Sequence, residues 1–239
     1  GHTVTLKYKF FSELDFSGAN LALEDAELSE VIFNGEKISI VPNGYFTDRQ
    51  IKTIALPLIK KGENTLSVTL PVTRLTCLEA CFILGNFRVR LEGTEKTILP
   101  MREKIGFGDI TAQGMPFYGA RIEYFADIEA PRDCCAAVSV KCYRGMLLRA
   151  ELDGEQLGII AFSPYEVYAP NVKKGKHRLK LTLYGSRYNC FGPLHVTDDK
   201  LLWQGPDAWK FMHDGKDRWK YEYSLKPMGI IAGPEIKYY

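Results

Sequence analysis

Hydrophobic and polar residues alternate in the same way along two separate stretches of the chain. Residues 60–70 (KKGENTLSVTL) and 173–183 (KKGKHRLKLTL) align without a gap, so Lys60 corresponds to Lys173 and Leu70 to Leu183. In each stretch a Lys-Lys-Gly sequence comes first, and leucine or valine then occupies every second position. Alternation with a period of two predicts a half-buried β-strand. The glycine predicts a turn just before each strand, because glycine adopts turn conformations that a Cβ atom resists.

Each of these stretches follows a predicted β-hairpin. Residues 31–40 (VIFNGEKISI) carry Asn34-Gly35 between apolar residues, which favours a type I′ turn, and residues 147–157 (LLRAELDGEQL) carry a similar Asp153-Gly154. The spacing from hairpin glycine to turn glycine is longer in the first copy (35 to 62) than in the second (154 to 175), a difference that loop insertions produce. A glycine-bearing aromatic turn follows each strand, at 84–87 and 190–193. The repeated order predicts two copies of one β fold.

The rest of the chain supports an all-β fold. Further strands are predicted over 3–11, 51–58, 89–99, 115–125 and 134–143, with a turn at 42–44 and part of a strand within 219–223. Helical periodicity is almost absent, and short strands between Gly/Pro turns are typical of a sandwich or barrel. Residues 100–113 break the strand pattern, and Gly106, Gly108 and Gly114 fall close together there between Pro100 and Pro116. We therefore predict a β-sandwich domain over residues 1–100, a connector over 101–113 and a second β-sandwich domain over 114–239.

Composition excludes some classes of partner. The chain has 239 residues with 46% hydrophobic, 12% aromatic and 25% charged residues, enough for sizeable cores in a globular protein. A net charge of +2 gives no electrostatic reason to expect nucleic acid or an anionic membrane as partner. The longest apolar runs, such as 228–232, are too short to span a bilayer. No signal peptide is recognisable, but the sequence begins in a predicted strand after Gly1, which resembles a tag scar, so we expect a piece of a longer protein.

The six cysteines predict no disulfide scaffold and no zinc site. They are Cys77, Cys81, Cys134, Cys135, Cys142 and Cys190. Their density is low, adjacent cysteines rarely pair, and 77 and 81 lack the spacing and histidine partners of zinc ligands. We expect buried, unpaired thiols that pack as small apolar groups. This favours a reducing, cytoplasmic compartment, while a secreted parent protein stays open.

The turns and strands together resemble a known family. The Asn-Gly-Glu hairpin at 34–36, the glycine-x-asparagine-x-leucine of 62–66 and the Leu-Gly-Asn-Phe of 84–87 resemble the galactose-binding-like jelly-roll domains in the C-terminal region of large bacterial glycoside hydrolases, both β-galactosidase-like and rhamnosidase-like. Segments 106–124 and 185–195 also look like recurrent segments of that group. The resemblance implies two tandem jelly-roll β-sandwiches. It also implies an accessory region that supports the catalytic domain of the same parent chain. The second copy departs from the motif, with His177 where the first has Asn64.

Catalytic chemistry is not indicated by any motif. Glycoside hydrolysis needs two carboxylates about 5 to 10 Å apart. The chain has many carboxylates, but none lies in a motif that predicts convergence on a pocket, and acidic side chains are mostly exposed. The nucleophile elbow, the P-loop and the zinc-protease helix motif are all missing from the sequence. We therefore expect no enzyme activity and no cofactor. A structural calcium ion is compatible with the fold, but no residue pattern predicts one.

One aromatic stretch suggests a binding function. Residues 195–223 contain all three tryptophans, Trp203, Trp209 and Trp219, interleaved with aspartates such as Asp207. Aromatic faces stack on pyranose rings while carboxylates and amides bind hydroxyl groups, so these residues are candidates for glycan contact. Arg187 and Asn189, at the end of a predicted strand, are further candidates. The aromatic residues could instead pack a long loop or contact a neighbouring domain or protein. Arg187 and Asn189 could instead make hydrogen bonds within a turn.

Overall fold

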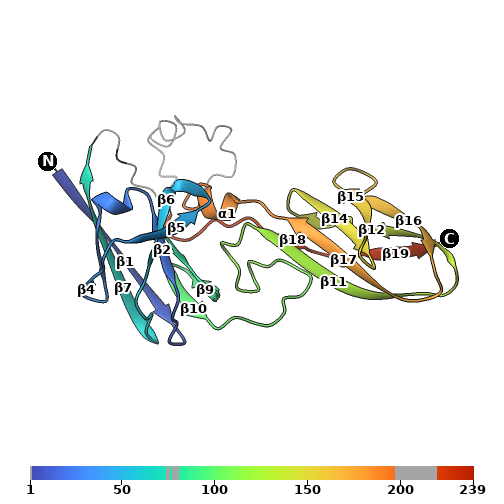
Figure 1. Ribbon diagram of the computed structural model, residues 1–239, viewed down its shortest axis with the longest axis horizontal. Helices are drawn as coiled ribbons and strands as arrows, with labels where there is room; N and C mark the ends of the chain where they lie inside the picture. Colours follow the sequence, from blue (N-terminus) through green and yellow to red (C-terminus); the bar gives the residue numbers. More distant parts are fainter. Residues whose placement is uncertain (1, 74–75, 77–80, 197–219) are drawn as a thin grey trace. The chain divides into compact units, whose positions relative to one another are not determined.

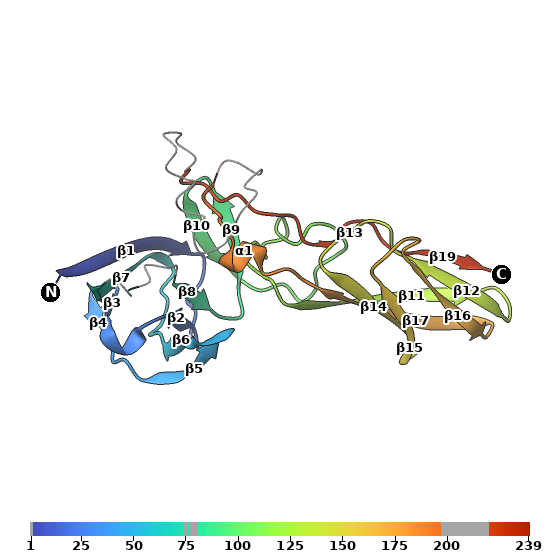
Figure 2. The same ribbon diagram turned by 90° about the horizontal axis from the view of Figure 1, so that it is seen from above.

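A computed structural model describes residues 2–73, 76, 81–196 and 220–239 (Figures 1 and 2). The chain divides into two compact units, Gly1–Glu103 and Lys104–Tyr239. The described helices are the single-turn η1 (Ala26–Leu28) and α1 (Tyr188–Phe191), and everything else regular is strand. The predicted all-β sandwich fold is confirmed, whereas the jelly-roll topology stays a prediction. Within the described ranges, no helix has the length and apolar character needed to cross a lipid bilayer.

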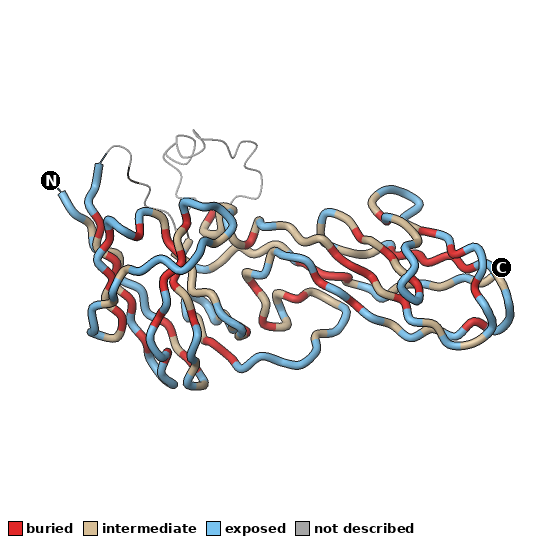
Figure 3. Tube along the Cα trace, in the orientation of Figure 1, coloured by how far each residue is buried: buried red, intermediate tan, exposed pale blue. Residues whose placement is uncertain are grey.

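Two sheets enclose the core of the first unit. The larger has the strand order β4 (Glu36–Lys37), β3 (Glu30–Phe33), β7 (Gly62–Val72), β1 (His2–Ser12), β10 (Glu95–Leu99), β9 (Arg88–Glu92). The smaller has the order β5 (Pro42–Phe46), β6 (Asp48–Ala55), β2 (Asn20–Leu23), β8 (Phe82–Leu84). Leu66 and Val68 of β7 pack in one buried cluster with Leu21 of β2 and Ile54 of β6. The alternation along 60–70 therefore places its apolar residues in the core of the unit. Figure 3 marks the buried positions of both units in red along the chain trace.

The second unit repeats this arrangement with fewer strands. One sheet has the order β11 (Arg121–Ala130), β17 (Gly175–Tyr184), β14 (Leu147–Leu152), β15 (Glu155–Ile160). The other has the order β16 (Glu166–Val172), β12 (Cys134–Ser139), β19 (Glu235–Tyr238), and β13 (Tyr143–Arg144) pairs with β18 (Gly229–Ile230). Leu179, Leu181 and Leu183 of β17 lie in the core. Ile110, from the stretch expected to be a connector, is fully buried in the same core.

Both predicted hairpins have the expected turn. Asn34 and Gly35 have φ values of 50° and 84°, and Asp153 and Gly154 have 51° and 88°. Positive φ at both central residues defines the type I′ turn, whose twist matches that of the flanking strands. The turn residues therefore set the pairing of β3 with β4 and of β14 with β15 next to each turn, while a register shift between Ala150 and Glu151 changes the pairing of β14 with β15 further from the turn.

A hydrogen-bond network, which we call the turn network, ties the first hairpin to the Lys-Lys-Gly turn. The buried Asn64 side chain accepts from the Lys60 N–H (3.0 Å) and the Asn34 amide (2.8 Å) through Oδ1, and it donates to the Lys60 carbonyl (2.7 Å) through Nδ2. Asn34 in turn accepts from the Thr65 N–H through Oδ1 (2.8 Å). Asn64 thus binds both its own loop and the hairpin.

An aspartate secures the Lys-Lys-Gly turn in both units. The Lys61 N–H donates to Asp15 Oδ1 (2.7 Å), and the Lys174 N–H donates to Asp133 Oδ1 (2.8 Å). Lys61 and Lys174 occupy the same position in the two aligned stretches. The sequence repeat is therefore also a repeat of specific backbone contacts.

Several local predictions are wrong because tertiary partners decide the conformation. Residues 42–44 form part of edge strand β5 instead of a turn, and an edge position tolerates Pro42, which has no N–H to donate. Residues 115–120 form turns, with the Met115 N–H bonded to the Ile110 carbonyl, so β11 begins at Arg121. The strand predicted over 134–143 ends at Ser139, because the chain changes partner from β19 to β18.

Two further expectations fail in the second unit. Residues 220–223 carry no strand, and the aromatic turn predicted at 190–193 is partly replaced by α1. The expectation of buried cysteines is also wrong for Cys135, which is exposed, while Cys81, Cys134, Cys142 and Cys190 are half-buried. All five are free thiols, and Cys77 lies outside the described residues.

Candidate functional site

The predicted binding residues that the structure describes lie at one end of the second unit. There, residues 193–196 and 220–226 run side by side, and we call this pair of segments the stem. The Lys220 N–H donates to the His195 carbonyl (2.9 Å), and His195 Nδ1 donates to the Lys220 carbonyl (3.1 Å). Ser224 donates through its N–H to the Leu194 carbonyl (2.6 Å) and through Oγ to the Val196 carbonyl (2.9 Å). The stem is thus held by backbone bonds at several points.

Asn189 anchors α1 to the stem. Its side chain is only 4% exposed, Nδ2 donates to the Lys226 carbonyl (2.8 Å), and Oδ1 accepts from the Lys226 N–H (2.9 Å). This reciprocal pair uses the amide fully on backbone groups, as the turn-bonding alternative describes. Asn189 thus contributes to the site by positioning the stem.

Arg187 precedes α1 and has an exposed side chain. Its carbonyl accepts from the Cys190 and Phe191 N–H groups at 2.9 and 3.0 Å, which closes the short helix. Arg187 therefore lies at the surface at the start of α1. The other four predicted residues, Trp203, Trp209, Trp219 and Asp207, lie outside the described residues.

Aromatic rings cluster on the stem in two different environments. Tyr223 contacts the Phe117 ring edge to face (5.1 Å between centroids) and the His195 ring (4.7 Å), so these rings pack the stem onto the unit. Tyr221 is 75% exposed, and Phe191 of α1 is 43% exposed. Large rings that remain in solvent on a rigid support can stack on the apolar face of a ligand. The aromatic stretch 195–223 predicted from the sequence contains Tyr221, but the tryptophans were its predicted site residues, and Phe191 was not among the candidates.

Cys190 beside the site is not an activated nucleophile. Its Sγ lies 2.7 Å from the Phe117 carbonyl oxygen, to which the thiol donates. Burial raises the pKa of the Cys190 thiol, and the nearby Arg187 opposes this rise. A protonated thiol that donates to a carbonyl is a structural group, because the thiolate is the reactive form.

Asp109 and Glu123, two of the many carboxylates, have structural partners. Asp109 accepts from the Thr111 N–H (3.0 Å) and the Met228 N–H (3.1 Å) through Oδ1, which holds the 108–111 loop to the chain just before β18. Glu123 pairs with Lys180 (3.1 Å) on an outer sheet face. Over the described ranges, no cluster of three or more histidine, cysteine or carboxylate side chains is arranged to hold a metal ion.

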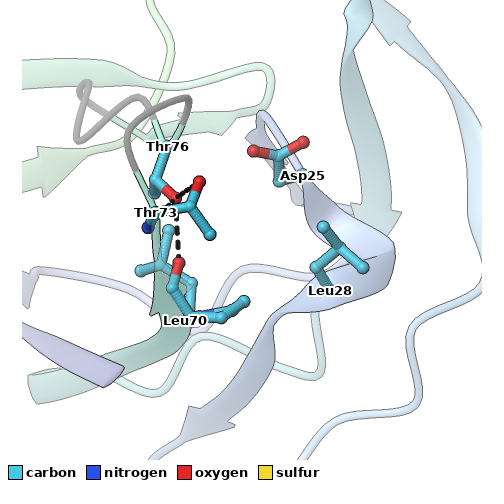
Figure 4. Close-up of a pocket in the computed structure, with 6 residues that line it drawn as sticks. Asp25, Leu28, Leu70, Thr73 and Thr76 are labelled. Carbon is cyan, nitrogen blue, oxygen red and sulfur yellow. Dashed lines mark hydrogen bonds between the residues drawn. The ribbon is translucent and has the colours of Figure 1, made fainter. Parts of the chain in front are cut away.

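A small pocket in the first unit lies between η1 and the end of β7 (Figure 4). Its volume is about 200 Å³, and its lining includes Asp25, Leu28, Leu70 and Thr73. The Thr76 hydroxyl is already bonded to the Pro71 carbonyl (3.0 Å) and to Thr73 (3.1 Å between hydroxyls). Sites for small molecules usually measure roughly 300 to 1,000 Å³. We therefore assign no ligand to this pocket and treat the stem as the candidate site.

Comparison with known proteins found no matching family model and no matching curated relative. Solved structures that are similar include a rhamnosidase from Novosphingobium sp. PP1Y, with 12% identity, a TM-score of 0.38, and coverage of 87% of this chain but 20% of that one. The chain therefore spans about a fifth of the rhamnosidase. They also include the Pleurotus ostreatus lectin in its apo form (10% identity, TM-score 0.27) and in complex with GalNAc (9% identity, TM-score 0.26). Each lectin alignment covers 77% of this chain and 68% of the lectin.

Proposed function

We propose that the chain is a non-catalytic, carbohydrate-binding-like accessory region of a bacterial glycoside hydrolase. In this role it supports the catalytic domain of its parent chain and contacts glycan through the stem. The observation that carries the proposal is the exposure of Tyr221 on the stem, whose two segments are joined by backbone hydrogen bonds. The family resemblance of the turns and strands supports the same role.

The chemistry of the stem suits a sugar. A pyranose presents an apolar face that stacks on an aromatic ring, and its hydroxyls need hydrogen-bond partners at the ring edge. Tyr221 supplies a ring with most of its surface in solvent, and the exposed Arg187 supplies guanidinium donors just before α1. The support is preorganised by the Asn189–Lys226 pair, so little ordering is required on binding.

Calorimetric titration of the 239-residue chain, guided by a glycan array, tests the proposal. Replacing Tyr221 by alanine should weaken glycan affinity at least about fivefold, because stacking contacts are typically worth about 1 kcal/mol or more. Tyr45→Ala is the matched control, since Tyr45 is a comparably exposed (58%) tyrosine on β5 of the first unit. Equal losses of glycan affinity in the two variants, or no binding to any glycan tested, would refute the proposed glycan contact.

The second candidate is a protein–protein or interdomain interaction module without sugar affinity. The same exposed Tyr221 favours it, because aromatic rings are enriched at protein interfaces. Analytical ultracentrifugation of the chain distinguishes one form of it. A monomer at all concentrations argues against self-association, and titration with the separate catalytic domain then tests for a partner in the parent chain.

A further inference from the structure

The second unit has a hydrogen-bond network equivalent to the turn network of the first, but different side chains form it. His177 occupies the position of Asn64 in the aligned stretches, and Asp153 occupies the hairpin position of Asn34. Asp153 Oδ1 accepts from the Arg178 N–H (2.7 Å), as Asn34 Oδ1 does from Thr65. The His177 ring then bridges Asp153 and the carbonyl of Lys173, the residue equivalent to Lys60.

The ring contacts fix the number of protons on His177. Nδ1 lies 2.6 Å from Asp153 Oδ2, and Nε2 lies 2.6 Å from the Lys173 carbonyl oxygen. A carboxylate and a carbonyl oxygen can only accept hydrogen bonds, so each ring nitrogen must donate. A neutral imidazole has one N–H and therefore satisfies only one of the two contacts. The geometry requires the doubly protonated, positively charged imidazolium.

The first unit makes the corresponding contacts without an ionisable group. Asn64 bonds both to Lys60 and to the hairpin Asn34 with an amide that carries no titratable proton. The His177 side chain is 11% exposed, so its contacts are partly shielded from solvent. The two units are thus held by equivalent contacts, of which one set depends on a proton.

Asp153 is the charged group in contact with the ring. On β11 the residue opposite His177 is Ile128, which packs against the core. The ammonium of Lys173 pairs instead with Asp133 (2.9 Å), and Arg178 lies over the Phe125 ring. Other charged side chains on the adjoining elements alternate to the outer face or are exposed, among them Asp127 and Glu129 on β11, Lys176 on β17, Lys174 in the turn and Glu155 on β15. Glu151 of β14 pairs with Arg149 and Lys180 on the outer face.

We propose that His177 is a pH-dependent latch, whose imidazolium holds the β14–β15 hairpin to the turn before β17 and whose deprotonation releases one of these two contacts. If the proton leaves Nε2, its lone pair faces the Lys173 carbonyl. If it leaves Nδ1, its lone pair faces the Asp153 carboxylate. In either case two acceptors oppose each other, and the end of the hairpin loses one attachment.

The electrostatic environment sets the pH range in which the latch is closed. The hydrogen bond to Asp153, followed by that to the Lys173 carbonyl, raises the pKa of His177 above its ordinary 6.5. The Arg178 N–H, followed by His177, lowers the pKa of Asp153 below its ordinary 3.8. Because His177 binds its proton more tightly in the folded chain, the protonated ring stabilises the fold, and this stabilisation is complete below pH 6.5. It is lost as the pH rises through the pKa that His177 has in the folded chain. The ionised Asp153 carboxylate, whose pKa is lowered in the folded chain, stabilises the fold above pH 3.8, and this stabilisation is lost on acidification. The latch is therefore strongest between these limits and opens on the alkaline side.

Nuclear magnetic resonance of the full chain tests the latch directly. Ring ¹⁵N shifts of His177, assigned by their loss in His177→Asn, should show two protonated nitrogens at about pH 6 and a pKa above 6.5. Asp153→Asn should move this pKa downward by removing the main partner. A single protonated nitrogen at that pH, or a pKa at or below 6.5, would overturn the proposal.

Amide exchange gives an independent readout. The Arg178 N–H donates to Asp153, so its protection factor should fall as pH rises through the His177 pKa, by about tenfold for each pH unit by which that pKa is raised. The Thr65 N–H is the matched control, because it donates to the non-ionisable Asn34. His177→Asn should remove the pH dependence at Arg178. Persistence of that dependence in the variant would assign it to another group and refute the latch.

Discussion

Replacing Asn64 by alanine tests whether the turn network stabilises the first unit. Asn64 has no exposed surface and makes four side-chain hydrogen bonds, two through each amide atom, to Lys60, Asn34 and the Gly62 carbonyl (3.2 Å). Alanine removes all four bonds, so the groups of Lys60, Asn34 and Gly62 lose their hydrogen-bond partner.

The loss of stability depends on the number of hydrogen bonds removed and on whether water can replace them. A hydrogen bond contributes about 1 kcal/mol net, which gives an upper value of roughly 4 kcal/mol. Lys60 is exposed, so water replaces part of the loss at its backbone groups. We therefore expect destabilisation of about 2 to 3 kcal/mol, equivalent to a roughly 30- to 150-fold larger open population of the turn.

Hydrogen exchange resolved by peptide measures this population within one unit. A single global unfolding curve is unsuitable, because a chain with two compact units need not unfold in one step. The Thr65 N–H and its neighbours in β7 should exchange faster by the stated factor, while the equivalent strand β17 serves as internal control. Asn64→His should recover part of the protection at low pH by imitating the second unit. Acceleration below about threefold in Asn64→Ala would refute the assigned role of the network.

Three further predictions concern packing and the site. At Gly229, with φ at 133°, a Cβ atom would collide with the carbonyl oxygen of Gly108. Gly229→Ala should therefore lower, by several degrees, the temperature at which the second unit unfolds, as followed by hydrogen exchange in β17 and β18. Gly106→Ala, where a Cβ atom meets no neighbour, should not, and equal shifts would contradict the clash. Leu181→Ala should lower the free energy of unfolding of the second unit by about 2 to 5 kcal/mol, because the side chain is buried. A denaturant titration followed by hydrogen exchange in β17 measures this loss. A loss below about 1 kcal/mol would mean that the core around Leu181 is loosely packed. Tyr221→Ala should change stability by less than about 0.5 kcal/mol while reducing glycan affinity, and a large loss of stability would instead assign the ring to packing.

Local backbone chemistry made the hairpins and the two long strands predictable. Asn34-Gly35 and Asp153-Gly154 adopt positive φ because these residues tolerate it, and no distant partner is needed to decide the turn type. The apolar residues of 60–70 and 173–183 face the cores for the simple reason that strand side chains alternate. These features depend on neighbours within a few residues.

Elements whose conformation depends on distant partners were predicted poorly. Pro42 lies in an edge strand only because β6 offers a neighbour on one side, and the chain leaves β12 at Ser139 because β18 is available as a new partner. At the candidate site, the sequence pointed to Arg187 and Asn189, but it could not show that the Asn189 amide would bind the backbone of Lys226, far along the chain. It also could not show that Tyr221 would stay in solvent while Tyr223 packs.

By itself, the sequence determined that this protein is all-β, that two similar strand patterns recur in it at 60–70 and 173–183, and where its tight turns lie. Those properties follow from side-chain alternation and from the φ values that each turn residue permits. Only the tertiary structure decided that the recurring strands close equivalent networks, one with the amide of Asn64 and the other with the imidazolium of His177. The physical reason is that a hydrogen-bond partner is chosen by distance in space, and Asn34 reaches Asn64, or Asp153 reaches His177, only when the strands between them pack.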